Sequence, residues 1–182
     1  MFLPAALLAA SAHAAPEYSI KAGYILLFTR YVEWPARAFA TPGAPIVVCV
    51  VGADPFGSVL DATLVGQLSQ RRPLSVRRVP DADATQDCHV AFIGTKGAER
   101  PSSEQTRQWL DVLAERPVLT ITETIESLQL GSMLTFVEEG VGDQSRIRFD
   151  ANLPPMHRAG LSASSQMLLA ARKIHRATSD EL

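Results

Sequence analysis

The sequence predicts one α/β domain built in three layers (α/β/α), with a mainly parallel sheet and an antiparallel hairpin at one edge. Between residues 17 and 122, short apolar runs typical of buried strands alternate with segments of helical spacing, as in parallel α/β folds. After residue 130, two further strand-like runs are joined by a turn-rich link, which indicates the hairpin. No repeat or linker divides the chain, so we assign residues 15–182 to a single domain.

The first helix is expected over residues 17–34. Its apolar side chains recur at helical spacing, from Ile20 through Phe28 to Trp34. Pro35 disfavours helical geometry at the residue before it, so the helix should end at Trp34. A Trp in that last turn can cover the end of the core without binding any ligand.

A buried strand followed at once by a helix is expected over residues 45–65. Residues 45–52, PIVVCVVG, form an apolar run rich in β-branched side chains, which suits a strand covered on both faces. Asp54 is a favoured N-cap and Pro55 a favoured first helical residue, which predicts a helix over residues 56–65. A strand, a glycine and a helix start could cradle an anion, but the glycines present match neither the dinucleotide fingerprint nor the phosphate loop.

Three more strands and one helix complete the central part of the chain. Residues 74–79 and 89–94 are expected to be strands, and residues 117–122 a further one. Ser102 and Gln105 form a capping box ahead of a helix that should reach about residue 116. The buried side of that helix is expected to hold Trp109, Leu110 and Leu113.

The C-terminal part predicts a hairpin and a last helix. Residues 132–137 and 146–150 are the two strands of the hairpin. In the second strand Ile147 and Phe149 share one face, which leaves the neighbouring charged residues on the other. A helix is expected over residues 164–176, and its buried side would hold Met167, Leu168, Ala171 and Ile174.

Composition argues against nucleic acid and for export. The 17 Lys and Arg are scattered among 19 Asp and Glu, for a net charge of −2, so no phosphate-neutralising stripe is visible. Residues 1–14 end in Ala12-His13-Ala14 and predict a signal peptide that is cleaved after Ala14 and is too short to span a bilayer. No Lys or Arg precedes the apolar run, which leaves open a translation start upstream of Met1. The alternative is a disordered, Ala-rich N-terminus.

Export changes the meaning of the two cysteines. In an oxidising compartment an even count favours a disulfide between Cys49 and Cys88, whereas in the cytosol two buried thiols would be more usual. We expect the disulfide, and a closed loop of about 40 residues is worth roughly 4 kcal/mol in the chain-entropy model. Cys88 and His89 do not form a catalytic pair, because neighbours on a strand point to opposite faces.

No catalytic or metal-binding pattern stands out, so the sequence predicts no enzyme, no metal and no cofactor. Residues 160–164, GLSAS, half-match a nucleophile elbow but lack its last glycine, and the histidines are isolated from one another. Glu138 and Glu139 favour a solvated turn over acid–base work, since adjacent strand residues diverge. The charged face of residues 146–150 is either an ordinary exposed strand face or a partner surface at a sheet edge.

Several segments together resemble the YfiR-like family of bacterial periplasmic proteins, over residues 20–174. They are KAGYILLFTRYVEWP, PIVVCVVGADPFG, CHVAFIG, RPVLTIT and RIRFDANLPPMHRAGLSASSQMLLAARKI. The most specific residues are Tyr31, Trp34 and Pro35, then Gly52, Asp54, Pro55, Phe56 and Gly57, and last the stretch from Arg148 to Gly160.

This resemblance implies regulation. Members of the family are soluble periplasmic repressors, known as dimers, that bind the periplasmic sensor domain of an inner-membrane diguanylate cyclase and so lower cyclic di-GMP and biofilm formation. The family's disulfide matches Cys49 with Cys88. A second cysteine pair of some relatives is missing here, which argues against redox control through a labile second bridge. Pro154 and Pro155 also depart from the family pattern and predict a stiffer, less helical segment before Gly160.

The predicted contact surface for the cyclase is the hairpin, because charged residues there stand beside apolar ones. Its candidate residues are Glu138, Glu139, Arg146, Arg148, Asp150 and Asn152. Two other functions stay open. One is a periplasmic small-molecule-binding sensor module without a cyclase partner, and the other is a secreted hydrolase that uses Ser162 or Ser164.

Overall fold

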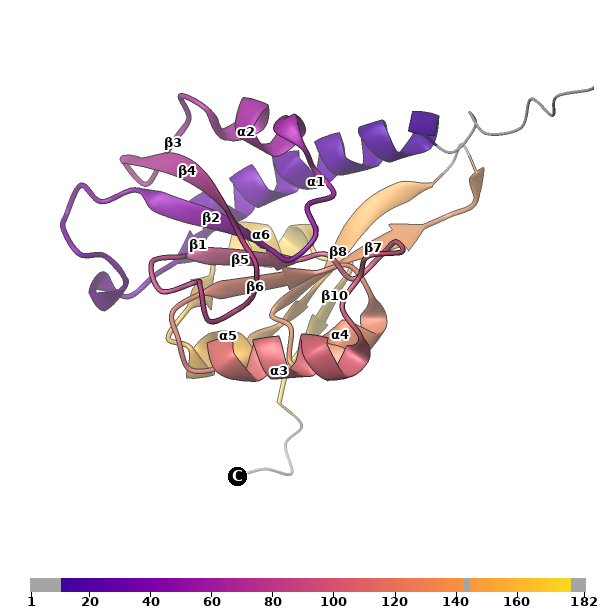
Figure 1. Cartoon of the computed structure of the whole chain (residues 1–182). Coiled ribbons are helices and arrows are strands. Elements are labelled where there is room, and N and C mark those ends of the chain that lie inside the picture. Colours follow the sequence, from indigo (N-terminus) through magenta and orange to yellow (C-terminus); the bar gives the residue numbers. More distant parts are fainter. Residues whose placement is uncertain (1–10, 143–144, 178–182) are drawn as a thin grey trace, which may run out of the picture.

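The computed structural model describes residues 11–142 and 145–177, with side chains from Glu17 onward, as a mixed α/β fold (Figure 1). The predicted signal peptide therefore lies largely outside the described residues. The helices are α1 (Ser11–Tyr31), the 3-10 helix η1 (Ala36–Ala38), α2 (Ser58–Leu64), α3 (Ser103–Leu113), α4 (Ile125–Gln129), α5 (Leu153–Arg158) and α6 (Ser165–Ala170). The strands are β1 (Val32–Glu33), β2 (Ile46–Val51), β3 (Leu68–Ser69), β4 (Arg72–Val79), β5 (Val90–Ile93), β6 (Leu119–Thr122), β7 (Leu134–Glu139), β8 (Arg146–Asn152), β9 (Ser162–Ala163) and β10 (Lys173–His175).

The sheet is mostly parallel, as predicted. Its eight strands run in the order β10-β8-β7-β6-β5-β2-β4-β3, and only β7 with β8 and β3 with β4 pair in antiparallel fashion. The expected three-layer, single-domain arrangement stays a prediction beyond this coarser description.

Apolar side chains cover both faces of the central strand β2. Val48 and Val50 belong to one core, which α1 and α2 cover, and Cys49 and Val51 belong to a second core with residues of α3. Figure 1 shows α1 and α2 on one side of the sheet and α3 on the other. All six residues of β2 are buried, which explains its uninterrupted apolar sequence.

The first helix is shorter at its C-terminal end than the sequence suggested. It stops at Tyr31, because Val32 and Glu33 form strand β1 and pair with the β9 residues Ala163 and Ser162. The prediction that the helix reaches Trp34 was therefore wrong. A long-range strand pairing ends the helix before the proline can.

The second helix also begins later than predicted. Its N-cap is Gly57 at a φ of 53°, and α2 starts at Ser58. Asp54 does not cap it. Instead, the Asp54 carboxylate accepts a hydrogen bond from the backbone N–H of Phe56 (2.8 Å), which makes a tight turn ahead of the helix.

The C-terminal segment departs most from the prediction. The expected helix over residues 164–176 ends at Ala170, and residues 173–175 form β10, which pairs in parallel with β8. The β7–β8 hairpin is therefore not the outermost part of the sheet. The segment with Pro154 and Pro155 is helical, contrary to the prediction, because both prolines lie in the first turn of α5, where a missing N–H costs no helical hydrogen bond.

Candidate partner-binding surface

The strand register brings Glu139, Arg146 and Arg148 onto one face of the hairpin, which they share with the buried Asp150. Glu139 lies opposite Arg146, and Val137 lies opposite Arg148. Directly opposite residues share a face, so Glu139, Arg146 and Arg148 form one charged surface. Ile147 and Phe149 point the other way and are buried, as predicted. We call Glu139, Arg146 and Arg148 the hairpin patch.

Glu138 lies on the opposite face from Glu139. It pairs with Ile147 in the register. Its carboxylate accepts a hydrogen bond from the Ser145 hydroxyl (2.5 Å) and lies 3.6 Å from the Lys96 ammonium. The divergence agrees with the sequence argument that this acidic pair does not act as one acid–base unit.

Asp150 is an internal anchor. Its side chain is 1% exposed and accepts hydrogen bonds from Arg172 at 2.8 Å (Nε) and 2.5 Å (Nη2). The hydrogen bond to Asp150 is also the main cause that raises the pKa of Arg172. Because Arg172 immediately precedes β10, this ion pair fastens β10 to β8.

Asn152 and Arg148 hold neighbouring loops. The Asn152 amide donates to the backbone oxygens of Ser132 (3.2 Å) and Leu128 (3.4 Å), which fixes the end of α4. The Arg148 guanidinium reaches the Ala170 oxygen at 3.5 Å, at the limit of hydrogen bonding. Arg148 therefore remains available to a partner.

Part of the outer edge of β8 extends past β10. The pairing with β10 covers Asp150, Ala151 and Asn152. Beyond it, the oxygen of Ile147 accepts a hydrogen bond from the hydroxyl of Tyr24 (3.2 Å). The hairpin patch thus lies beside a stretch of strand edge that no neighbouring strand pairs with among the described residues.

An apolar groove of about 300 Å³ lies next to this edge. Helices α1 and α6 and strand β8 line it through Tyr24, Leu27, Tyr31, Phe149 and Met167. Leu27 is 41% exposed and Leu169 of α6 is 87% exposed. Sequence reasoning missed the groove, since it depends on how α6 packs against α1. Apolar side chains on the exposed sides of both helices, such as Leu27 and Leu169, were the sequence feature that could have indicated it.

A network of charged side chains ties α1 to the far end of the sheet. The Lys21 ammonium is fully buried, lies 2.5 Å from Glu123 and also binds Glu17. The Lys96 ammonium lies 3.3 Å from the Glu17 carboxylate and also forms an ion pair with Glu138. Partial burial alone would raise the pKa of Glu17, but the hydrogen bond and charge of Lys21, together with Lys96, lower it below its usual value.

Tyr18 lies against the same network. Burial, then the charge and hydrogen bonding of Glu123, raise the pKa of the Tyr18 phenol. Its ring packs edge-on against Phe56 (centroids 5.3 Å apart) and lies 4.5 Å from the Lys21 ammonium. The aromatic ring of Tyr18 therefore covers one side of this charged network.

Trp34 and His89 join the first loop to the sheet. The buried Trp34 indole donates to the His89 backbone oxygen (3.1 Å). The His89 ring accepts at Nδ1 from the Val47 backbone N–H (3.1 Å) and contacts the Ala38 oxygen through Nε2 (3.0 Å). Phe39 stacks on that ring at 4.5 Å. The YVEWP stretch is therefore a structural anchor.

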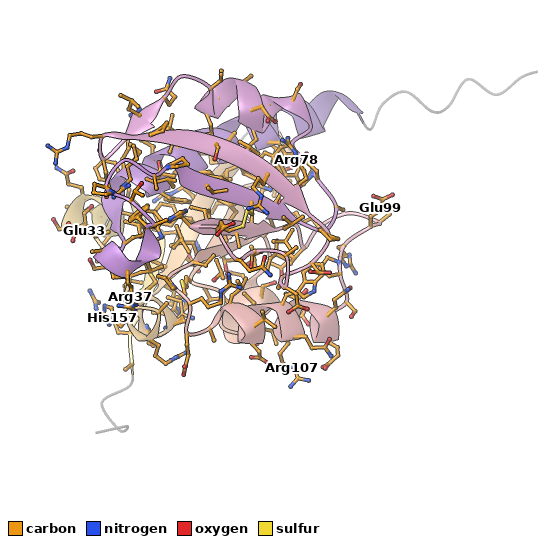
Figure 2. All side chains as sticks on the ribbon, turned by 60° about the vertical axis from the view of Figure 1, so that its left-hand side comes forward. Glu33, Arg37, Arg78, Glu99, Arg107 and His157 are labelled. Atoms are coloured by element: carbon orange, nitrogen blue, oxygen red, sulfur yellow. A yellow bond between two sulfur atoms is a disulfide. The ribbon has the colours of Figure 1, made fainter. Side chains whose placement is uncertain are left out.

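The turn from β2 to α2 is clamped by Arg78, which reaches over from β4 (Figure 2). Its guanidinium binds Asp54 (2.9 Å), Asp61 and the backbone oxygen of Gly57 (2.6 Å). Gly52 has a φ of +76°, and an added Cβ would meet the Trp109 ring at 3.0 Å. Gly52 is therefore required for packing against α3.

Three further signature residues make contacts within the fold. Pro35 precedes η1 and accepts at its oxygen from the Ala38 N–H (2.9 Å). Phe56 is buried against Phe92, with ring centroids 4.7 Å apart. Gly160 has a φ of +75°, and a Cβ there would lie 2.8 Å from the Arg37 guanidinium.

The two candidate serine nucleophiles have structural roles. Ser162 lies in β9 and its hydroxyl donates to Glu33 (3.3 Å), whereas Ser164 caps α6 by accepting from the Met167 N–H (3.3 Å). Within residues 11–142 and 145–177, no three His, Cys, Asp or Glu side chains lie grouped as metal ligands would. Nor is any helix of that part of the chain both long and apolar enough to cross a bilayer.

Cys49 and Cys88 form a disulfide with a Cα–Cα distance of 5.9 Å. It links β2 to the segment ahead of β5 within the second apolar core. The predicted pairing is confirmed.

Comparison with known proteins agrees with this architecture. The fold is similar to the crystal structure of a conserved domain protein from Vibrio cholerae O1 biovar eltor, with a TM-score of 0.53 and 8% sequence identity. That match covers 84% of this chain and 59% of the other. Because the sequence identity is so low, the match concerns the fold alone. The family described as YfiR/HmsC-like matches residues 18–172. This match spans all the signature residues, and the chain belongs to the YfiR/HmsC-like family.

Proposed function

We propose that this protein is a periplasmic repressor that binds the sensor domain of an inner-membrane diguanylate cyclase and lowers cyclic di-GMP. Membership in the YfiR/HmsC-like family over residues 18–172 is the observation that carries the proposal, because the family points to periplasmic regulation of cyclic di-GMP signalling. Export through residues 1–14 and a homodimeric state belong to the same proposal. The disulfide fits an oxidising compartment.

The hairpin patch is the contact surface that we propose. Arg146 and Glu139 are exposed and Arg148 is half-buried, so their charges are available at the surface. The adjoining apolar groove between α1 and α6 supplies area that a partner could bury. Asp150 and Asn152 contribute indirectly, because they hold β10 and the end of α4 in place.

Repression requires a difference in affinity between two states of the cyclase. A repressor that binds the inactive sensor conformation more tightly shifts the population towards it by that free-energy difference. Fixed charges on a rigid strand suit this task, since complementary charge sets orientation and specificity as well as the association rate.

The test is intracellular cyclic di-GMP in the native host after deletion of the gene. We expect a rise that the full chain reverses, and that a chain without residues 1–14 does not. Arg148→Glu should restore repression poorly, with at least about fivefold weaker binding to the purified cyclase sensor domain, because one favourable charge contact becomes repulsive.

The matched control is Arg77→Glu, which reverses an exposed arginine on β4, at the other end of the sheet. It should repress normally. Unchanged cyclic di-GMP on deletion would reject the repressor function. A rise on deletion together with equal affinity of the two variants would reject only the placement of the contact surface.

A further inference from the structure

Strand β10 is attached to the sheet mainly at one carboxylate. It is the outermost strand at one end of the sheet, is only three residues long, and pairs in parallel with the β8 residues Asp150, Ala151 and Asn152. Asp150 accepts two hydrogen bonds from Arg172 (2.8 Å and 2.5 Å), directly ahead of β10. A strand this short contributes few ladder hydrogen bonds, so the side-chain contacts of Asp150 control how often β10 opens.

His175, at the end of β10, directs a ring nitrogen at the same carboxylate. Its Nε2 atom lies 3.5 Å from an Asp150 carboxylate oxygen. This nitrogen is buried and has no hydrogen-bond partner among the described residues. Burial without a partner costs the free energy of the hydrogen bonds that water would otherwise make, so such an atom is uncommon. The position therefore suits one charge state of the ring better than the other.

The charged state of the ring is the one that fits. A protonated imidazole carries a proton on both nitrogens, so Nε2 becomes a charged donor that faces a charged acceptor. The Asp150 side chain is 1% exposed, and water and salt therefore screen the attraction only weakly. An imidazole gains its charge between about pH 5 and pH 8, within the range that bacteria meet outside the cytoplasm.

The other charges near β10 are farther from the ring or better screened. The Arg172 guanidinium repels a protonated ring, but a carboxylate has lone pairs for both donors. Arg148 of β8 is directed towards the Ala170 oxygen (3.5 Å). The remaining charged or titratable groups on β7, β8, α5 and the β10 segment are all exposed: Glu139, Arg146, His157 (Figure 2), Arg158, Lys173 and Arg176.

We propose that Asp150, Arg172 and His175 form a pH-dependent contact, the β10 latch. In mild acid the protonated His175 ring binds Asp150 alongside Arg172 and keeps β10 on β8. As the pH rises and the ring loses its proton, this attraction is lost and β10 opens more often. The latch is a property of the fold, so it stands whether or not the protein represses a cyclase.

Opening of β10 changes the surface beside the hairpin patch. It uncovers the backbone edge of residues 150–152, which adds to the stretch of β8 that no strand pairs with among the described residues. An uncovered strand edge is a surface on which an extended segment of another protein can pair. The pH around the protein thus controls how much of this edge is accessible.

Amide hydrogen exchange followed by NMR at pH 5.5 and pH 7.5 tests the latch, after correction for the intrinsic pH dependence of exchange. The Arg172 amide is the reporter, since it donates to the Phe149 oxygen of β8 (2.8 Å). We expect its protection to be at least about threefold greater at pH 5.5. The amides of the buried strand β2 are the internal reference for changes in global stability.

Three variants assign the effect to one ring. His175→Gln should remove the gain in protection at pH 5.5, because glutamine does not titrate. His175→Lys carries a positive charge at both pH values and should keep the Arg172 amide protected at both. His157→Gln is the matched control, since it removes an exposed histidine of α5, which packs on β10, and should behave as the parent does.

Two results would overturn the proposal. One is a parent protein whose Arg172 amide is equally protected at the two pH values or less protected in acid, relative to β2. The other is a gain in acid that His175→Gln retains. Circular dichroism of each variant checks that the fold is kept, and His175→Lys remains informative if His175→Gln loosens β10 at every pH.

Discussion

His89 connects three parts of the structure through one ring. It accepts from Val47 of β2, contacts the oxygen of Ala38 in η1 and stacks on Phe39. Since Nδ1 accepts a backbone N–H, the ring is neutral and carries its proton on Nε2, which donates to Ala38. Burial, together with the nearby charge of Arg72, lowers the pKa of His89 despite the opposing effect of the Ala38 carbonyl and Asp87.

Stability should therefore fall in mild acid. An unfolded His has a pKa of about 6.5, so below that value the unfolded chain binds a proton that folded His89 resists. The free energy of unfolding is expected to be at its full value above about pH 6.5 and to decrease as the pH falls towards the lowered pKa of the folded state. Urea unfolding at a series of pH values measures this.

His89→Gln is the matched variant, because it removes the titrating group and keeps polar atoms at the site. Its pH slope over this range should be shallower than that of the parent. Equal slopes in both proteins would show that another group controls the acid sensitivity.

Some properties of individual residues could be predicted from the sequence and others could not. The cysteine pairing and the inward faces of Ile147 and Phe149 followed from local arguments and were confirmed. The burial of Asp150 did not, since alternation in β8 puts Asp150 on the same face as Arg146. Arg172, which is 22 residues away in sequence, supplies the charge-assisted hydrogen bonds that make burial of that carboxylate favourable.

Among the helices, α1 is attached to the sheet by an unusual contact. Lys21 and Glu123 are both fully buried at the side chain and lie 2.5 Å apart. Glu123 also accepts from the Thr95 N–H (3.2 Å), and its own N–H donates to the Thr95 hydroxyl (3.0 Å). The pair therefore links α1 to the ends of β5 and β6.

Lys21→Met should destabilise the protein by about 3–5 kcal/mol, because it leaves the Glu123 carboxylate buried without a cation. Adding Glu123→Gln to Lys21→Met should recover part of the loss, since the remaining buried charge is removed. Lys96→Met is the control, as that ammonium is one-third exposed and should matter by less than about 1 kcal/mol. A Lys21→Met protein as stable as Lys96→Met would mean that the buried pair contributes no net stability.

The elements that sequence analysis found are those with strong local patterns. β2, β5 and β6 are short, fully buried strands, and the capping serine of α3 accepts from the Gln105 N–H as expected. The misassigned ones depend on distant partners. Ile174 continues the helical spacing of the apolar residues before it, but pairing with β8 makes residues 173–175 a strand. The ending of α1 depends in the same way on β9.

For the whole molecule, the disulfide acts mainly on the unfolded chain. Cys49 and Cys88 are 39 residues apart, and cross-linking a loop of that length restricts the unfolded chain by roughly 4 kcal/mol before any native strain is subtracted. The variant Cys49→Ala/Cys88→Ala should lose about 2–4 kcal/mol in urea unfolding. A reductant should lower the stability of the parent and leave the double variant unchanged. If the parent were insensitive to reductant throughout unfolding, the cross-link would have no such role.

The candidate surface could be anticipated only in part. Charge and alternation in the sequence identified the hairpin, and the structure groups Glu139, Arg146 and Arg148 there. The apolar groove was not anticipated. It is formed between α1, α6 and β8, which are far apart in the chain, and no local pattern carries that information.

The opening and closing segments of the described chain lie against each other. Strand β1 pairs with β9, the Ser164 N–H donates to the Tyr31 oxygen (2.8 Å), and α6 packs on α1. A polypeptide that crosses a membrane with its N-terminus first would therefore deliver α1 long before the part of its covering surface that β8 and α6 supply. Its apolar side would need protection from proteases and aggregation during that interval, and the native structure would form only once the whole chain had crossed.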